Sequence, residues 1–174
     1  MKKIVVNDTN IFIDLYEVGL LEEFFSLPWE VHTTDFVMLE LQREGQHETV
    51  AKYKDGRRLV VPVLEAEEML EIGYLYQQNQ NRTNLSLTDC SVWFYAKVNN
   101  YILLTGDRKL RKASVFDGVE VHGVIYVFDQ LVELDIISRQ VAVDKLQKLY
   151  NLNPRLPKEE IDKRISKWKA EIRR

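Results

Sequence analysis

The chain has 174 residues, a length that suits one domain, and its 45% hydrophobic and 29% charged residues exclude intrinsic disorder. A single cysteine, Cys90, excludes an internal disulfide and a zinc cage, so we expect a reducing, cytoplasmic setting. The net charge of −3 weakly opposes a general nucleic-acid binder, although local basic patches can still exist.

The first half of the chain alternates between strand and helix patterns. Short apolar runs predict strands over residues 4–6, 29–33 and 59–64. Polar Asn7 and Asp8 end the first run far too early for a signal peptide. Helical spacing of apolar residues predicts a helix after residue 10, a second helix capped by Asp35 that reaches about Glu44 or beyond, and a third over residues 65–80.

The second half continues this alternation and then becomes helical. Ser86 and Asp89 match a capping box that opens a helix to about Val98. Strands are predicted over 101–105 and 119–121, with a short basic helix between them. Helices are predicted over 125–137, over 138–150 and from Lys158. Strands that alternate with helices predict a parallel sheet covered on both faces, and no apolar run approaches the roughly 20 residues of a membrane span.

Four carboxylates stand at positions where such a fold forms ligand sites. Asp8 and Asp107 each follow a predicted strand, so we expect both at the carboxyl edge of the sheet. Asp89 and Glu40 fall on apolar helix faces, where an ionised carboxylate is costly unless it is paired or bound to metal. Each acid also has a simpler explanation, because the three aspartates could cap helices and Glu40 could lie at the rim of its face.

Taken together, the four acids are more informative than any one of them. The three histidines are scattered without ligand-like spacing. Oxygen ligands alone suit a hard cation such as Mg2+ or Mn2+, which can clamp a phosphodiester and activate a water. A hydrolytic nuclease needs little besides such an ion.

Four stretches resemble the PIN domain family and occur in the family's order. They are residues 6–12 (VNDTNIF), 33–41 (TTDFVMLEL), 85–91 (LSLTDCS) and 103–110 (LLTGDRKL). The resemblance covers roughly residues 3–125. It implies an α/β fold, a three-layer α/β/α sandwich with a mainly parallel central sheet. Residues 1–135 would form the nuclease domain, and residues 136–174 would form a C-terminal helical extension.

The resemblance also implies an activity, a Mg2+- or Mn2+-dependent endoribonuclease. Its metal-binding and catalytic residues would be four acids, Asp8, Glu40, Asp89 and Asp107. Asn10 and Thr105 match positions that often support the site, and we expect them among the substrate-binding residues, although Asn10 could simply cap a helix and Thr105 could simply end a strand. Arg108 and Lys109, in a basic stretch over residues 108–112, could meet the RNA backbone. Many small bacterial members are toxins held silent by an antitoxin protein, and they often form homodimers. The resemblance thus implies RNA, an antitoxin and a second copy as partners.

Two other functions stay open. The first is a catalytically silent PIN-like module that binds RNA or protein, although acids at all four positions count against it. The second is a phosphatase with Asp8 as nucleophile, a chemistry that normally wants an acid where this chain has Asn10. Four aromatic side chains could stack on bases or line a dimer contact, namely Tyr74, Tyr76, Trp93 and Tyr95. Their helical spacing favours a core or interface role.

Overall fold

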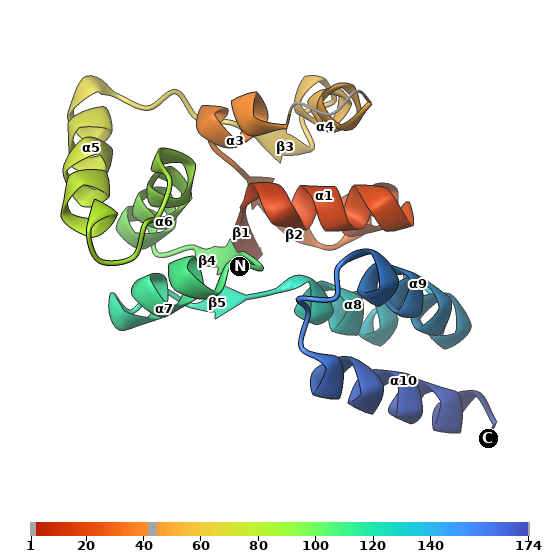
Figure 1. Ribbon diagram of the computed structural model, residues 1–174. Coiled ribbons are helices and arrows are strands. Elements are labelled where there is room, and N and C mark those ends of the chain that lie inside the picture. Colours follow the sequence, from red (N-terminus) through yellow and green to blue (C-terminus); the bar gives the residue numbers. More distant parts are fainter. Residues whose placement is uncertain (1–2, 42–44, 174) are drawn as a thin grey trace. The chain divides into compact units, whose positions relative to one another are not determined.

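The computed structural model describes residues 3–41 and 45–173 (Figure 1). The chain divides into two compact units. The first unit contains the residues up to Ile13 together with Pro28–His122, and the second contains Asp14–Leu27 and Gly123–Arg174. Each unit is therefore built from two segments that are separate in the sequence.

A five-stranded, all-parallel sheet forms the centre of the first unit. Its strands lie in the order β3 (Leu59–Val60), β2 (Trp29–His32), β1 (Lys3–Asn7), β4 (Ile102–Leu104) and β5 (Val121–His122). Successive side chains of a strand point to opposite faces, yet both Val5 and Val6 of β1 are fully buried. Burial on both faces is what a parallel sheet covered by helices requires, and the predicted parallel sheet is confirmed.

Helices flank this sheet (Figure 1). They are α3 (Asp35–Glu40), α4 (Gln46–Asp55), α5 (Ala66–Gln80), α6 (Leu87–Asn99) and α7 (Arg108–Phe116). Helix α6 packs on β1 and β4, α5 packs on α6, and α7 contacts β5 and α6. Helix α1 (Thr9–Val18) starts directly after β1, with its first five residues in the first unit and the others in the second. The predicted α/β fold class is confirmed.

Several boundaries differ from the prediction. The strand expected over residues 59–64 is only two residues long, because Pro62 lacks the N–H that a ladder needs and Val63 is 85% exposed. The strand expected over residues 119–121 is Val121–His122. Thr34, not Asp35, is the N-cap of α3, which ends at Glu40. The expected continuation of this helix reaches residues 42–44, which lie outside the described residues.

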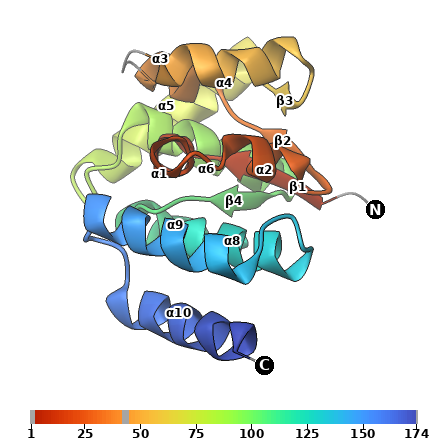
Figure 2. The ribbon, with the colours of Figure 1, turned by 90° about the vertical axis from the view of Figure 1, so that its right-hand side faces the viewer.

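The second unit consists of helices. Besides the end of α1 it contains α2 (Leu21–Ser26), α8 (Val124–Glu133), α9 (Arg139–Leu152) and α10 (Lys158–Ile172). Helix α8 packs on α2 and α9. Helix α10 packs along α9, as Figure 2 shows. The three helices predicted after residue 124 are thus present. Across the described residues, no helix combines the length and the apolar character needed to cross a bilayer.

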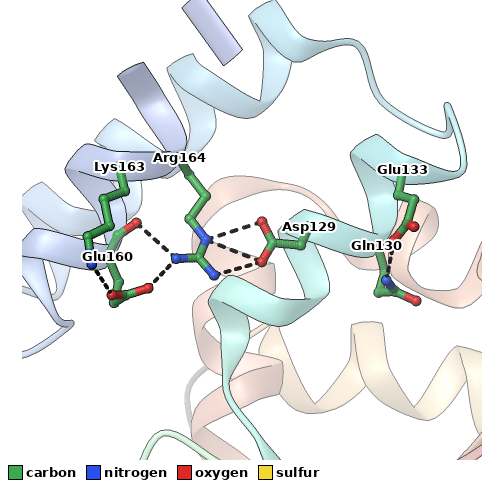
Figure 3. A network of polar contacts seen from close by, with 6 residues as sticks. All are labelled: Asp129, Gln130, Glu133, Glu160, Lys163 and Arg164. Carbon is green, nitrogen blue, oxygen red and sulfur yellow. Dashed lines mark hydrogen bonds and ion pairs between the residues drawn. The ribbon is translucent and has the colours of Figure 1, made fainter. Parts of the chain in front are cut away.

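Helix α10 is held by apolar burial and by a polar network (Figure 3). Ile161 and Trp168 are 1% and 3% exposed. Arg164 donates from Nη2 to Asp129 Oδ2 on α8 at 3.0 Å, and it also donates to Glu160 on its own helix. Part-exposed ion pairs of this kind contribute about 1 kcal/mol or less, so the two buried side chains contribute most of the stability of this contact.

Candidate active site

Two of the predicted acids, Asp8 and Asp107, follow the carboxyl ends of the neighbouring strands β1 and β4. Asn7 pairs with Leu104, and the backbone N–H of Asp8 donates to the Leu104 carbonyl at 3.0 Å. The Asp8 side chain is almost fully buried, and its Oδ2 accepts a bond of 2.6 Å from Thr105 Oγ1. The same hydroxyl oxygen accepts a bond of 3.0 Å from the backbone N–H of Asp107. Thr105 therefore connects Asp8 with the start of the Asp107 loop.

Asn10 joins the same two loops from the other strand end. Its Nδ2 donates to Asp8 Oδ2 at 2.8 Å, and its Oδ1 accepts a bond of 2.7 Å from the backbone N–H of Gly106. A Cβ atom at Gly106 would lie 3.2 Å from Asn10 Oδ1, so the close approach depends on the missing side chain. Sequence reasoning assigned Asn10 and Thr105 to the site, and in the structure both hold the Asp8 carboxylate. It missed Gly106, whose place directly after a strand end was the available signal.

Glu40 reaches the site through Thr9. Thr9 Oγ1 donates to Glu40 Oε2 at 2.8 Å, which links the last residue of α3 to the first residue of α1. The expectation that Glu40 faces inward was wrong, because Val37 and Met38 occupy the buried face of this short helix and Glu40 is exposed. Thr9 was also missed by sequence reasoning. A hydroxyl residue directly beside the first acid was the signal that could have found it.

Asp89 and Asp107 both cap helices, as the simpler explanation held. Ser86 Oγ accepts a bond from the Asp89 backbone N–H at 3.0 Å, and the Ser86 N–H donates to Asp89 Oδ2 at 2.7 Å. Asp107 Oδ1 accepts a bond of 2.8 Å from the N–H of Leu110. Among the described residues, these side-chain bonds engage one oxygen of each carboxylate. The second oxygen of each remains for another ligand.

Electrostatic repulsion connects all four acids. Burial raises the pKa of Asp8 to about 7, against the hydrogen bond from Thr105, and the charges of Asp89 and Glu40 raise it further. Burial also raises the pKa of Asp89, and the charges of Asp107 and Glu40 add to this increase. No ion pair between described residues includes any of these four acids. The carboxylates therefore share a region of negative potential that a cation would relieve.

The donor set suits a hard divalent cation, although the side chains do not form a closed cage. All four groups offer carboxylate oxygens, the ligands that Mg2+ and Mn2+ prefer. Within residues 3–41 and 45–173, no three His, Cys, Asp or Glu side chains gather closely enough to hold a metal ion. Asp89 and Asp107 each use one carboxylate oxygen to cap their own helix.

The basic stretch at the start of α7 divides into two kinds of residue. Arg108 and Lys109 are exposed in the first turn. Arg111 is half-buried and donates from Nη1 to the Val121 carbonyl and from Nη2 to the Thr105 carbonyl, each at 3.2 Å. Burial lowers the pKa of Arg111. Arg111 therefore holds strand ends together, while Arg108 and Lys109 remain available to solvent or a ligand.

The aromatic residues of α5 and α6 also divide. Trp93 and Tyr95 of α6 are buried, which confirms the core interpretation for these two. The Tyr95 hydroxyl is bonded to His32 Nδ1 at 2.8 Å. Tyr74 of α5 is 56% exposed, so it belongs to the surface of the first unit.

Comparison with known proteins gives a family and a fold. A family model described as a PIN domain matches residues 4–170. The chain is similar to the crystal structure of PAE2754 from Pyrobaculum aerophilum, with 14% identity, coverage of 76% of this chain and 99% of that one, and a TM-score of 0.53. It also matches VapBC2 from Rickettsia felis bound to a DNA fragment from their promoter (17% identity, 69% and 98% coverage, TM-score 0.47). A third match is FitAcB from Neisseria gonorrhoeae, with 13% identity, coverage of 70% of this chain and 99% of that one, and a TM-score of 0.40. None of the curated proteins matches the chain.

Proposed function

The chain belongs to the PIN domain family, and on this premise we propose that it is a Mg2+- or Mn2+-dependent endoribonuclease. One observation carries the proposal. Asp8 is buried at the carboxyl edge of a parallel sheet, its pKa is raised to about 7, and Asp89 and Glu40 contribute to that increase. A buried carboxylate whose pKa is raised further by other acids, with no cationic partner among the described residues, is suited to a divalent cation.

The chain's own residues would hold and orient the reacting groups. Asp8, Glu40, Asp89 and Asp107 would hold the cation, which supplies Lewis-acid activation of water and neutralises charge on the phosphodiester. Thr105 and Asn10 fix the orientation of the Asp8 carboxylate through bonds of 2.6 and 2.8 Å. Thr9 does the same for Glu40 at 2.8 Å. Arg108 and Lys109 would contact the RNA backbone.

Narrower proposals follow from family membership. The enzyme would act in the cytoplasm as the toxin of a toxin–antitoxin pair, held silent by an antitoxin protein, and would form a homodimer. The C-terminal helices after residue 135 would act as an extension of the nuclease domain. Growth arrest on expression, relieved by a co-expressed neighbouring gene product that copurifies with the chain, would support the toxin role.

A second candidate function is a catalytically silent module that binds RNA or protein. The observation that favours it is that no three metal-ligating side chains gather among the described residues. In this case the capping bonds of Asp89 and Asp107 would be the whole role of these acids. A cleavage assay separates the two candidates.

The test is cleavage of a mixed RNA pool with added Mn2+ or Mg2+. We expect the wild-type protein to cut and Asp8→Asn to lose at least about 100-fold in rate, because the ligand set loses its central charge. Asp162→Asn, a change to an exposed acid of α10, is the matched control and should cut like wild type. Equal cutting by Asp8→Asn would remove Asp8 from the mechanism. RNA that is bound but never cut, with either metal, would favour the silent module.

A further inference from the structure

Helix α7 presents one face to solvent, and the proposed function accounts only for its first two residues, Arg108 and Lys109. Leu110 and Ser114 turn inward and are fully buried. At 100° per residue, the opposite side of the helix carries five exposed side chains, which we call the α7 outer face. They are Arg108, Lys109, Lys112, Val115 and Phe116. Asp107 caps the same helix, so the outer face begins at the candidate active site.

The cations of the α7 outer face are not neutralised within the described chain. No hydrogen bond or ion pair among described residues engages the side chains of Arg108, Lys109 or Lys112. The nearby acids are occupied elsewhere, since Asp117 pairs with Lys97 at 2.6 Å and Glu120 contacts His122 at 2.7 Å. A chain of net charge −3 therefore keeps a local positive patch beside its acids.

The far end of the same face is aromatic. Phe116 is 91% exposed and Val115 is 55% exposed. A single exposed apolar side chain needs no explanation, but here one lies on a line with three free-standing cations. The rise of 1.5 Å per residue places Phe116 about 12 Å along the helix from Arg108. Cations followed by an aromatic ring are the combination with which proteins hold single-stranded nucleic acid, through phosphate contacts and base stacking.

We propose that the α7 outer face is the path of the single-stranded RNA substrate, with Arg108, Lys109 and Lys112 on its phosphates and Phe116 stacked on a base beyond the cleavage site. This inference rests on the proposed ribonuclease function, and it names the surface that this function uses. The positive charge of this face favours RNA as its occupant over an apolar protein segment. Three clustered cations attract phosphates, but they attract a protein partner only if that partner is acidic. Stacking tolerates any base, so this contact would position RNA without selecting a sequence.

The test measures binding of a fluorescein-labelled oligouridine of about ten nucleotides by fluorescence anisotropy. Asp8→Asn serves as the background because it is expected not to cut the probe. On it we compare Phe116→Ala, Phe116→Leu and Phe116→Tyr, with Tyr74→Ala as the matched control for an exposed aromatic on α5. Phe116 touches little of the protein, so these variants should fold normally.

Stacking at Phe116 has a distinct pattern of outcomes. We expect Phe116→Ala and Phe116→Leu to weaken binding about fivefold or more, Phe116→Tyr to keep it, and Tyr74→Ala to leave it unchanged. Arg108→Ala and Lys112→Ala should each reduce the slope of log affinity against log salt by about 0.7. Equal affinity of all Phe116 variants, or full rescue by leucine, would overturn the proposal, because the second result would mean an apolar contact that needs no aromatic ring.

Failure of this proposal and failure of the ribonuclease function give different results. If Phe116→Ala binds the oligouridine normally while the wild-type protein still cuts RNA with metal, the path is wrong and the activity stands. If no variant binds the probe and wild type cuts no RNA, both are overturned. An equal loss of binding in Tyr74→Ala would also overturn the assignment of the path to α7.

Discussion

Asp14 is a buried carboxylate that the candidate active site does not use. It lies in the second unit, is 6% exposed, and accepts a bond of 3.1 Å from Asn153 Nδ2. Burial raises its pKa to about 6, the Asn153 bond opposes this increase, and the charge of Glu17 adds to it. One neutral amide donor does not replace the water that an ionised carboxylate loses on burial.

The raised pKa of Asp14 predicts a pH-dependent stability. Because the folded pKa lies above the ordinary value of 3.8, this group's stabilising contribution is complete below about pH 4 and is lost as pH rises through 6. Asp14→Asn keeps the acceptor for Asn153 and cannot ionise. We expect it to raise the free energy of unfolding by about 1–3 kcal/mol at about pH 8, and to change it little near pH 4. Urea unfolding at both pH values measures this, with Asp162→Asn as control; a constant difference would contradict the assignment.

Among the helices, two glycines have the same free space around them but differ in backbone conformation. Gly73 stands inside helix α5, and Gly118 follows α7 with φ +81°. A Cβ atom added at either position would meet nothing within 4 Å. Packing is therefore the same for both, and only the backbone conformation separates them.

This pair makes a matched prediction about helix stability. Gly73→Ala should raise the free energy of unfolding by about 0.5–1 kcal/mol, because alanine has less unfolded-state freedom and no clash. Gly118→Ala should lower it by about 1 kcal/mol, because an L side chain disfavours positive φ. Thermal or urea unfolding of the two variants would measure the signs. Loss of stability in Gly73→Ala would show that another surface packs closely against α5.

At the scale of the whole molecule, the chain enters each unit twice. The second unit combines residues 14–27 with the segment from Gly123 onward, so its helices α2 and α8 pack together across about 100 residues of sequence. Helix α10 at the end of the chain contributes to this unit through Ile161 and Trp168. A change near the C-terminus should therefore affect the stability of a unit that also contains α2.

Trp168→Ala tests the contribution of α10. Removing this 3% exposed side chain should cost about 3–5 kcal/mol of unfolding free energy, through lost burial and the remaining cavity. Lys169→Ala, at the exposed neighbouring position, should change it by less than about 0.5 kcal/mol. Urea unfolding compares the two variants. It is followed by far-ultraviolet circular dichroism, because the tryptophan fluorescence changes when Trp168 is removed. A cost below about 1 kcal/mol would mean that α10 adds little to the unit.

The order of the elements, and the strand-end positions of Asp8 and Asp107, were readable from the sequence. Apolar runs such as residues 4–6 and the capping box of Ser86 and Asp89 are local patterns, and both appear in the structure as predicted. They are readable because strand burial and helix capping depend on residues only a few positions apart. The same local logic failed for Glu40, since the buried face of a helix as short as α3 is decided by what packs on it.

The bonds that hold Asp8 and Glu40 depend on contacts between residues far apart in the sequence. The bond from Thr105 to Asp8 joins residues 97 apart, and the bond from Thr9 to Glu40 joins residues 31 apart. Both depend on which strands are neighbours in the sheet, and no local pattern encodes strand order. The raised pKa of Asp8 and the chain's division into two units also depend on contacts between residues far apart in the sequence. Residue types and their local spacing indicate which side chains could do the chemistry, whereas the distances between them follow from long-range packing.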